Sequence, residues 1–282
     1  MPLNRRVLVL ALACVLAAPA VQAAPDAPAL YKEHCAECHG ADRFGGTGPA
    51  LLPENLGRLR PQAAAKVIAE GRAASQMAGF ADRLDKDAVA ALAQYIFTPI
   101  PVPQWGEKEI AASRVVHARP QDLPARPVHT ADPLNLFTVV EIGDHHVTIL
   151  DGDRFEPLWR FPSRFALHGG AKYSPDGRFV YLASRDGWVS KYDLHGLMPV
   201  AETRVAVNTR NIAVSGDGRY VAAGNGLPPS IVILDAGDLS VKKIIPVAGD
   251  GGKPSRVSAV YDAAPRKSFI IALRDMPELW EI

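Results

Sequence analysis

The pattern of hydrophobic and polar positions changes twice along the chain. After an apolar run at residues 7–18, residues 29–34 and 85–97 follow the helical period. Residues 98–135 contain seven prolines, which is typical of an extended, semi-rigid connection. Beyond residue 135, short β-type runs alternate with turns that contain Gly and Asp. The pattern therefore predicts a small helical domain, a proline-rich linker at residues 99–135 and an all-β domain at residues 136–282.

The first 23 residues have the layout of a secretory signal peptide. Arg5 and Arg6 precede the apolar run, and small residues lead to a predicted cleavage after Ala23. The run is too short to span a membrane comfortably, and no later stretch reaches about 18 apolar residues without interruption. Cys14 is an alternative lipid-attachment site, but the apolar run continues beyond it. We expect a mature chain without a membrane span, exported to the periplasm.

Composition narrows the class of protein. The 282 residues are 48% hydrophobic and 22% charged, with 31 basic side chains against 30 acidic ones. A disordered chain would be more polar, and binding to a polyanion would need a basic excess, so neither disorder nor a nucleic-acid partner is expected. Three cysteines are too few for a disulfide framework. Cleavage would remove one of them and leave Cys35 and Cys38.

These two cysteines belong to a haem-attachment motif. Cys35-Ala-Glu-Cys38-His39 has the CxxCH spacing at which two thiols bond the vinyl groups of a c-type haem and the histidine binds iron. The alternatives are a CxxC redox pair, which would need a βαβ context, and a zinc site, which would need further soft ligands. Neither context is present, and c-type haem is attached outside the cytoplasm. We expect covalent haem c on Cys35 and Cys38, with His39 as an axial ligand.

Met77 is the candidate for the second axial ligand. It lies 38 residues after His39 and is the only methionine between the CxxCH motif and Met198. A lone methionine usually fills a core, but this one lies in a polar, glycine-flanked loop before the helix predicted at residues 85–97. A thioether ligand would favour the reduced iron. The backbone of residues 46–51, Gly-Thr-Gly-Pro-Ala-Leu, can fix the ring of His39.

The order of these parts over residues 24–98 resembles class I cytochromes c. A helix, CxxCH, GxGPxL, a methionine loop and a terminal helix follow one another as in that family. One departure is Ala78, where the family often has proline. The resemblance implies an all-α domain that transfers electrons through haem c.

The β region contains an internal repeat. Residues 174–180 recur at 215–221, an offset of 41, and Asp151, Asp193 and Asp235 are separated by 42 residues each time. A period of about 40 residues with Asp-Gly turns is typical of β-propeller blades, and we assign the turns no chemistry. Residues 136–282 provide about three and a half such units, whereas propellers close with about four to eight blades. We expect a truncated propeller; a short form completed by a partner is the alternative.

The ordered motifs of the β region resemble the opening blades of the haem d1 propeller. They are residues 135–140, 150–153, 165–168, 174–179, 184–187 and 226–230. A cytochrome c domain before an eight-bladed haem d1 propeller is the architecture of the cytochrome cd1 family, which comprises nitrite reductases and their dihydro-haem d1 dehydrogenase paralogues. The resemblance implies a two-domain fold, all-α cytochrome c followed by an all-β propeller.

The resemblance also implies residues that bind haem d1. His168 matches the proximal iron ligand; by itself, a histidine before two glycines is more often structural, but the glycines let a macrocycle approach the backbone. Arg185 and Arg210 match cationic residues that bind the macrocycle's carboxylates, as guanidinium groups do bidentately. Lys172 and Arg256 are weaker candidates. The catalytic residues themselves are expected in later blades.

Two departures favour the dehydrogenase over the reductase. Residues 271–276, directly before Pro277-Glu278, contain no histidine, whereas the reductase pattern has histidines there. The CxxCH also follows the leader without a longer N-terminal arm. We expect oxidation of a propionate of dihydro-haem d1 to acrylate, with electrons leaving through haem c to a soluble periplasmic acceptor. The nitrite reductase would then receive the haem d1. The alternatives are a nitrite reductase, which forms nitric oxide, and a haem d1 carrier without catalysis.

Overall fold

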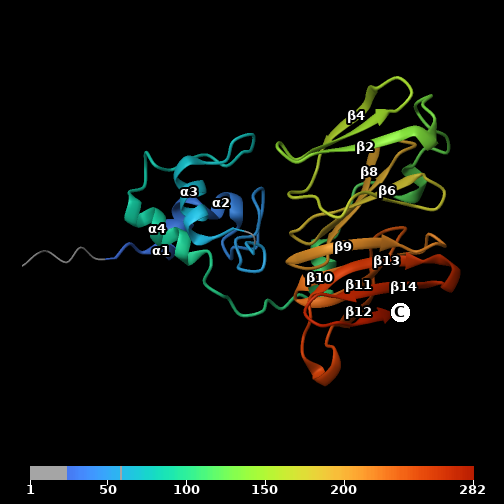
Figure 1. Ribbon diagram of the computed structural model, residues 1–282. Helices are drawn as coiled ribbons and strands as arrows, with labels where there is room; N and C mark the ends of the chain where they lie inside the picture. The colour runs from blue at the N-terminus through green and yellow to red at the C-terminus, as the bar shows by residue number, and fades with distance from the viewer. Residues whose placement is uncertain (1–23, 58) are drawn as a thin grey trace, which may run out of the picture.

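A computed structural model describes residues 24–57 and 59–282 of the chain (Figure 1). The predicted signal peptide lies outside the described residues. The helices near the N-terminus form one domain, and the strands form a second domain of sheets stacked beside one another (Figure 1). The fold class predicted from the sequence, a helical cytochrome domain before part of a propeller, is confirmed.

The first domain consists of four helices. They are α1 (Ala27–His34), α2 (Ala36–His39), α3 (Pro61–Glu70) and α4 (Lys86–Tyr95). The helices predicted at residues 29–34 and 85–97 are therefore both present. Asp26 and Asp85 cap α1 and α4, and the Asp85 carboxylate accepts a hydrogen bond from the Ala88 amide at 2.8 Å. The apolar faces of α1, α3 and α4 enclose a core that includes Tyr31 and Leu92.

Arg43 is a buried residue of this domain that binds the C-terminal end of α4. Its side chain is buried, and its guanidinium donates to the carbonyl of Tyr95 at 2.6 Å and to that of Thr98 at 2.8 Å. The last carbonyls of a helix lack partners in the helix itself. Arg43 therefore supplies donors at the end of α4, and its positive charge complements the negative end of the helix dipole. The guanidinium also lies over the Tyr95 ring, 4.8 Å from its centroid.

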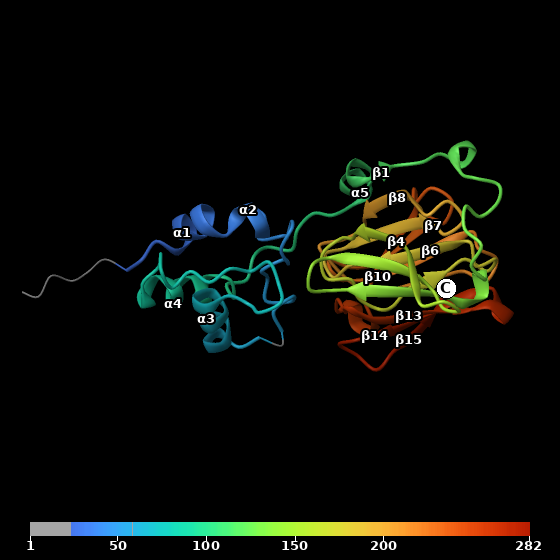
Figure 2. The ribbon, with the colours of Figure 1, turned by 90° about the horizontal axis from the view of Figure 1, so that it is seen from above.

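The proline-rich segment contains regular structure that its composition does not predict. It includes the helix α5 (Glu107–Ser113), the strand β1 (Val115–Val116) and the 3₁₀ turns η1 (Pro120–Asp122) and η2 (Pro133–Asn135). Ile110 of α5 is fully buried in the core of the β domain. β1 pairs antiparallel with β8 (Met198–Arg204), the outer strand of a blade, and Figure 2 shows α5 and β1 beside it. The segment is thus fastened to the propeller.

The β domain consists of four antiparallel sheets in chain order. The first contains β2 (Leu136–Glu141), β3 (His146–Asp151) and β4 (Glu156–Pro162); the second contains β5 (Lys172–Tyr173), β6 (Phe179–Ala183), β7 (Trp188–Asp193) and β8, joined by β1; the third contains β9 (Asn208–Val214), β10 (Tyr220–Leu227), β11 (Pro229–Asp235) and β12 (Val241–Pro246); the fourth contains β13 (Val257–Ala263), β14 (Ser268–Leu273) and β15 (Leu279–Glu281). Consecutive antiparallel sheets of about four strands are typical of propeller blades, and the first and fourth sheets have three strands each. Buried apolar side chains fill the spaces between neighbouring sheets.

The repeated aspartates occupy equivalent turns in three blades. Asp151, Asp193 and Asp235 end β3, β7 and β11. Each carboxylate accepts hydrogen bonds from backbone amides two or three residues further on, for example from Gly237 to Asp235 at 2.7 Å. Side chains that bond the backbone in this way stabilise turns. The structural interpretation of the repeat is confirmed.

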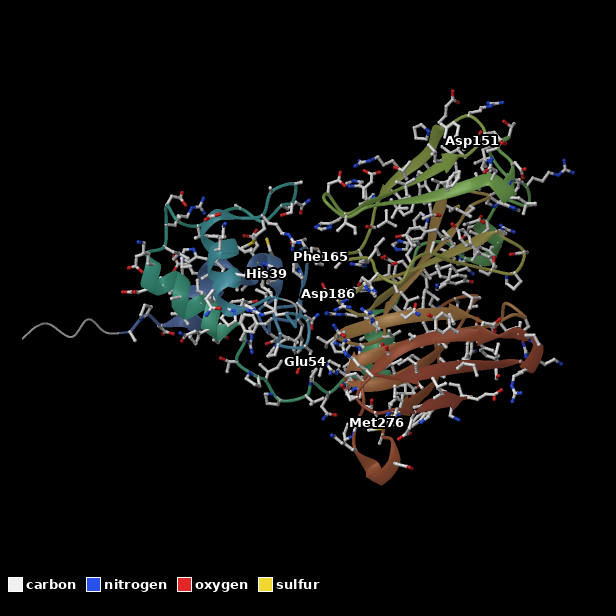
Figure 3. All side chains as sticks on the ribbon, viewed as in Figure 1. His39, Glu54, Asp151, Phe165, Asp186 and Met276 are labelled. Atoms are coloured by element: carbon white, nitrogen blue, oxygen red, sulfur yellow. The ribbon has the colours of Figure 1, made fainter. Side chains whose placement is uncertain are left out.

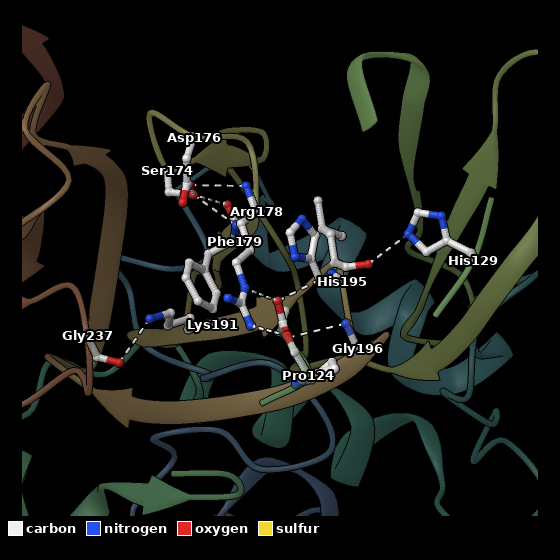
Figure 4. Close-up of polar contacts among 12 residues, drawn as sticks. Pro124, His129, Ser174, Asp176, Arg178, Phe179, Lys191, His195, Gly196 and Gly237 are labelled. Carbon is white, nitrogen blue, oxygen red and sulfur yellow. Dashed lines mark hydrogen bonds and ion pairs between the residues drawn. The ribbon is translucent and has the colours of Figure 1, made fainter. Parts of the chain in front are cut away.

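A polar cluster joins the second blade to the linker and to the third blade (Figure 4). Arg178 donates to the buried Asp193 carboxylate at 2.9 Å and to the Pro124 carbonyl of the linker at 2.9 Å. Lys191 is buried beneath the Phe179 ring and donates to the Gly237 carbonyl at 2.9 Å. Desolvation lowers the pKa of Lys191 to about 8. These contacts join neighbouring blades and the linker, so we assign the cluster a structural role.

Candidate haem sites and the boundary between the domains

His39 is held in one orientation by the loop after the CxxCH motif. Its ring is buried, and Nδ1 lies 2.8 Å from the Pro49 carbonyl oxygen. Because a carbonyl only accepts, Nδ1 carries the proton and Nε2 keeps its lone pair. Gly48 packs so closely that a Cβ at that position would lie 2.8 Å from the ring. The backbone of residues 46–51 therefore fixes this ring, as the sequence predicts, and leaves Nε2 able to bind iron.

The two thiols of the motif are free. Cys35 is partly buried and ends α1, whereas Cys38 is exposed. Desolvation raises the pKa of the Cys35 thiol to about 11, while burial lowers the pKa of the His39 imidazole. Two free thiols beside a histidine with an available Nε2 fit covalent attachment of haem c.

Met77 lies in a tight loop that touches the propeller. Its carbonyl accepts a hydrogen bond from the Arg72 amide at 3.0 Å, and its amide donates to Ser75 Oγ at 3.3 Å. A Cβ on Gly143, in the turn between β2 and β3, would lie 2.8 Å from the Ala74 carbonyl oxygen, so this loop packs against the first blade. The half-buried side chain of Met77 agrees with a role at the haem, and its ligation of iron stays a prediction.

His168 and Arg210 form a pair in the propeller. His168 Nδ1 donates to the Arg210 carbonyl at 3.0 Å, and Arg210 Nη1 lies 3.1 Å from His168 Nε2. The His168 amide donates to the Ala183 carbonyl at 2.7 Å, which holds the residue beside β6. Because a guanidinium only donates, Nε2 accepts this hydrogen bond from Arg210 Nη1 with its lone pair. Gly170 has φ +72°, and a Cβ there would meet nothing within 4 Å.

The backbone brings Arg185 to the same place. Its amide donates to the Ala166 carbonyl at 2.9 Å, and its carbonyl accepts from the Thr209 amide at 3.1 Å. Arg185 thus lies between the segments that carry His168 and Arg210. These three predicted residues come from separate parts of the chain and are brought together in one group.

The two weaker candidates, Lys172 and Arg256, have other surroundings than His168, Arg185 and Arg210. Lys172 lies in β5 opposite Tyr181 of β6, and the hydrogen bonds recorded for residues 24–57 and 59–282 do not join it to His168 or Arg210. Arg256 donates to the Asp275 carboxylate at 2.9 Å, so an acidic group of the protein already partners its charge.

The haem-bearing loop docks on the propeller through Asp186. This residue lies in the turn between β6 and β7, and its Oδ1 accepts from the Ala50 amide at 3.1 Å. Arg204 of β8 donates to the carbonyls of both Phe44 and Asp186, the latter at 2.7 Å. An apolar cluster of Leu52, Val207 and Leu227 lies beside these contacts. Figure 3 shows His39 on one side of the boundary, with Phe165 and Asp186 on the other.

Asp186 is an unusual carboxylate. It is 3% exposed, and its Oδ2 is buried without a hydrogen-bond partner among the described residues. Burial raises the pKa of Asp186 to about 6, against the opposing effects of the Ala50 hydrogen bond and the positive charges of Arg204 and Arg185. Arg43 lies in no motif that the sequence analysis recognised. Asp186 lies in the motif at residues 184–187, but sequence reasoning assigned it no contact with the haem-bearing loop.

Comparison with known families assigns both domains. Residues 131–282 match the family described as Cytochrome D1 heme domain, and residues 22–96 match Cytochrome C oxidase, cbb3-type, subunit III. The chain belongs to the Cytochrome D1 heme domain family. Its N-terminal match makes the first domain a cytochrome c domain, which implies covalent haem c. Within residues 24–57 and 59–282, no helix has the length and apolar content that a membrane span requires.

Comparison with individual proteins shows which members of the family the chain resembles. The chain is 58% identical over 278 residues to dihydro-heme d1 dehydrogenase of Pseudomonas aeruginosa PAO1, covering 98% of this chain and 56% of that protein. It is 28% identical over 273 residues to the nitrite reductase of Stutzerimonas stutzeri, covering 88% of this chain and 47% of that protein. The chain thus spans about half the length of the curated relatives it matches.

A solved structure gives the same relationship. Dihydro-heme d1 dehydrogenase NirN in complex with DHE superposes with a TM-score of 0.86 at 61% sequence identity, covering 90% of this chain and 55% of that one. The resemblance to the dehydrogenase branch of the family, expected from the sequence, is therefore confirmed.

Proposed function

We propose that the protein is an oxidoreductase that converts dihydro-haem d1 to haem d1. A propionate side chain of the substrate loses two hydrogens and becomes an acrylate, which releases two electrons and two protons. The observation that carries the proposal is the grouping of His168, Arg210 and Arg185 in a haem d1-type propeller joined to a cytochrome c domain. The 58% identity to a dihydro-heme d1 dehydrogenase supports it.

His168 is the proposed ligand of the substrate's iron. The Arg210 carbonyl holds the proton of the ring on Nδ1, so Nε2 would coordinate the iron in place of its hydrogen bond from Arg210 Nη1. A guanidinium 3.1 Å from Nε2 places positive charge where the carboxylates of a tetrapyrrole need partners. Arg210 and Arg185 are the proposed carboxylate-binding residues, and Lys172 is a weaker third candidate.

Haem c is the proposed one-electron acceptor. Cys35 and Cys38 would hold it covalently, and His39 and Met77 would bind its iron. The hydrogen bond to Pro49 keeps the His39 ring in position, and the buried boundary at Asp186 keeps the haem-bearing loop against the propeller. The bound haem would accept the two electrons of each oxidation one at a time, and the two protons would leave to solvent.

We infer that the protein works in the periplasm. The signal-peptide pattern at residues 1–23 supports export, and attachment of c-type haem takes place outside the cytoplasm. A soluble electron carrier would reoxidise haem c. The product, haem d1, would pass to a cytochrome cd1 nitrite reductase.

A substitution at His168 tests the binding site. His168→Ala should abolish the axial-ligand signal of added dihydro-haem d1 in electron paramagnetic resonance, while the haem c spectrum stays unchanged. His195→Ala is the matched control, because His195 lies in the turn after β7. An unchanged d1 signal in His168→Ala would reject the ligand assignment. Binding without oxidation in the wild type would indicate a carrier, and rapid turnover of nitrite would indicate a reductase.

A further inference from the structure

A single peptide group connects the haem c histidine to the propeller. His39 Nδ1 donates to the Pro49 carbonyl at 2.8 Å, and the amide of the next residue, Ala50, donates to Asp186 Oδ1 at 3.1 Å. The Pro49–Ala50 peptide therefore accepts a hydrogen bond at one end and donates one at the other. Linked hydrogen bonds polarise one another. A negative charge on Asp186 thus makes the Pro49 carbonyl a stronger acceptor for the His39 ring.

A stronger hydrogen-bond acceptor at Nδ1 of His39 changes the reduction potential of the iron that His39 binds. Partners of the second ring nitrogen raise the basicity of a ligating histidine and fix its orientation. More electron density on His39 stabilises the ferric form and lowers the reduction potential of haem c. The charge of Asp186 thus reaches the iron through Ala50, Pro49 and His39.

The turn that carries Asp186 also supports the other haem site. The preceding residue, Arg185, bonds Ala166 and Thr209 through its backbone, and these residues lie next to the segments that bear His168 and Arg210. Gly187 completes the turn with φ +90°, and a Cβ there would lie 1.7 Å from the Ala206 carbonyl oxygen. The turn can therefore shift little without disturbing the propeller.

The surroundings leave the charge of Asp186 largely uncompensated. Gly45 packs against Oδ2 so closely that a Cβ would lie 2.8 Å away, and Oδ2 has no hydrogen-bond partner among the described residues. The charged groups that act on it are Arg204 and Arg185. Arg204 directs its donors to the backbone carbonyls of Asp186 and Phe44, so it attracts the carboxylate only through space.

We propose that Asp186 is a positioning residue that docks the haem c loop on the propeller and lowers the reduction potential of haem c through the Pro49–Ala50 peptide. The inference rests on the part of the proposed function in which His39 binds haem c. It does not depend on oxidation of dihydro-haem d1.

Asp186→Asn separates the charge from the contact. The amide keeps an oxygen that can accept from Ala50 but carries no charge. Spectroelectrochemical titration of haem c at pH 7.5 should show a higher potential in the variant. We expect the ratio of reduced to oxidised haem at a fixed solution potential to rise by about tenfold, which corresponds to 59 mV for one electron. Asp186→Ser, which is also uncharged, should shift the potential in the same direction and replaces Asp186→Asn if that variant does not fold.

Asp217→Asn is the matched control. It removes the same charge from an exposed turn in which Asp217 accepts hydrogen bonds from Ser215 and Arg219. Its haem c potential should equal that of the wild type. An unchanged potential in the Asp186 variants, or an equal shift in Asp217→Asn, would overturn the proposal. Because the readout needs haem c alone, this failure is distinguishable from failure to oxidise dihydro-haem d1.

Discussion

Replacement of Arg43 by methionine should destabilise the cytochrome domain. The substitution keeps an apolar chain in a buried position, where Arg43 is 3% exposed, but removes the donors to Tyr95 and Thr98 at 2.6 and 2.8 Å. Hydrogen bonds to charged groups contribute about 1.5–3 kcal/mol each. Water can reach some of the freed helix-end carbonyls, so we expect a loss of about 3 kcal/mol in the free energy of unfolding.

The assay is guanidinium chloride unfolding followed by the Soret band of haem c, which reports on this domain alone. A loss of about 3 kcal/mol lowers the midpoint by roughly 1 M when the denaturant dependence is about 3 kcal/mol per M. Arg83→Met is the matched control, because Arg83 also lies over an aromatic ring but is 65% exposed and pairs only with Asp82. Its midpoint should stay within about 0.2 M of the wild type, in keeping with the small worth of exposed ion pairs. Equal midpoints for the two variants would refute the role of Arg43 at the end of α4.

Three further predictions concern the boundary and the propeller. Because burial raises the pKa of Asp186 from 3.8 to about 6, its ionisation costs the folded state about 3 kcal/mol above pH 6 and nothing below pH 3.8. The stability advantage of Asp186→Asn over the wild type should therefore shrink by about 1.5 kcal/mol between pH 7.5 and pH 5. A difference in stability that does not change with pH would contradict this prediction. Asp193→Ala should lower propeller stability by about 1.5–3 kcal/mol, since it removes the charge-assisted hydrogen bonds from Arg178 and leaves that guanidinium only the Pro124 carbonyl as a hydrogen-bond partner among the described residues. Arg178→Met in the same background should recover part of the loss in calorimetry. Ile110→Ala should lower the free energy of unfolding by about 2–5 kcal/mol and make the linker sensitive to limited proteolysis. An unchanged cleavage pattern in this variant would contradict the role of Ile110.

Sequence reasoning reaches furthest where a feature depends on local spacing. The CxxCH motif places Cys35, Cys38 and His39 within five residues, so a short pattern carries most of the haem c site. The 42-residue period of the Asp turns identified the blades for a similar reason, because each turn is built from neighbours in the chain.

The remainder depends on contacts between distant segments. Arg43 bonds carbonyls 52 and 55 residues away, and Asp186 meets Ala50 across 136 residues, so no local pattern predicts either contact. The proline-rich segment was also harder to predict. Its composition indicates an extended chain, yet tertiary packing of Ile110 stabilises the short helix α5 there.

The proposed activity is tested most directly by counting electrons. Dihydro-haem d1 is added without oxygen to the purified protein with its haem c in the ferric state, and absorption spectra follow both chromophores. The account predicts that two haem c groups are reduced for each macrocycle that gains the haem d1 spectrum, because one haem accepts one electron and the oxidation releases two. Formation of haem d1 without reduction of haem c, or tight binding with no change in either spectrum, would contradict it.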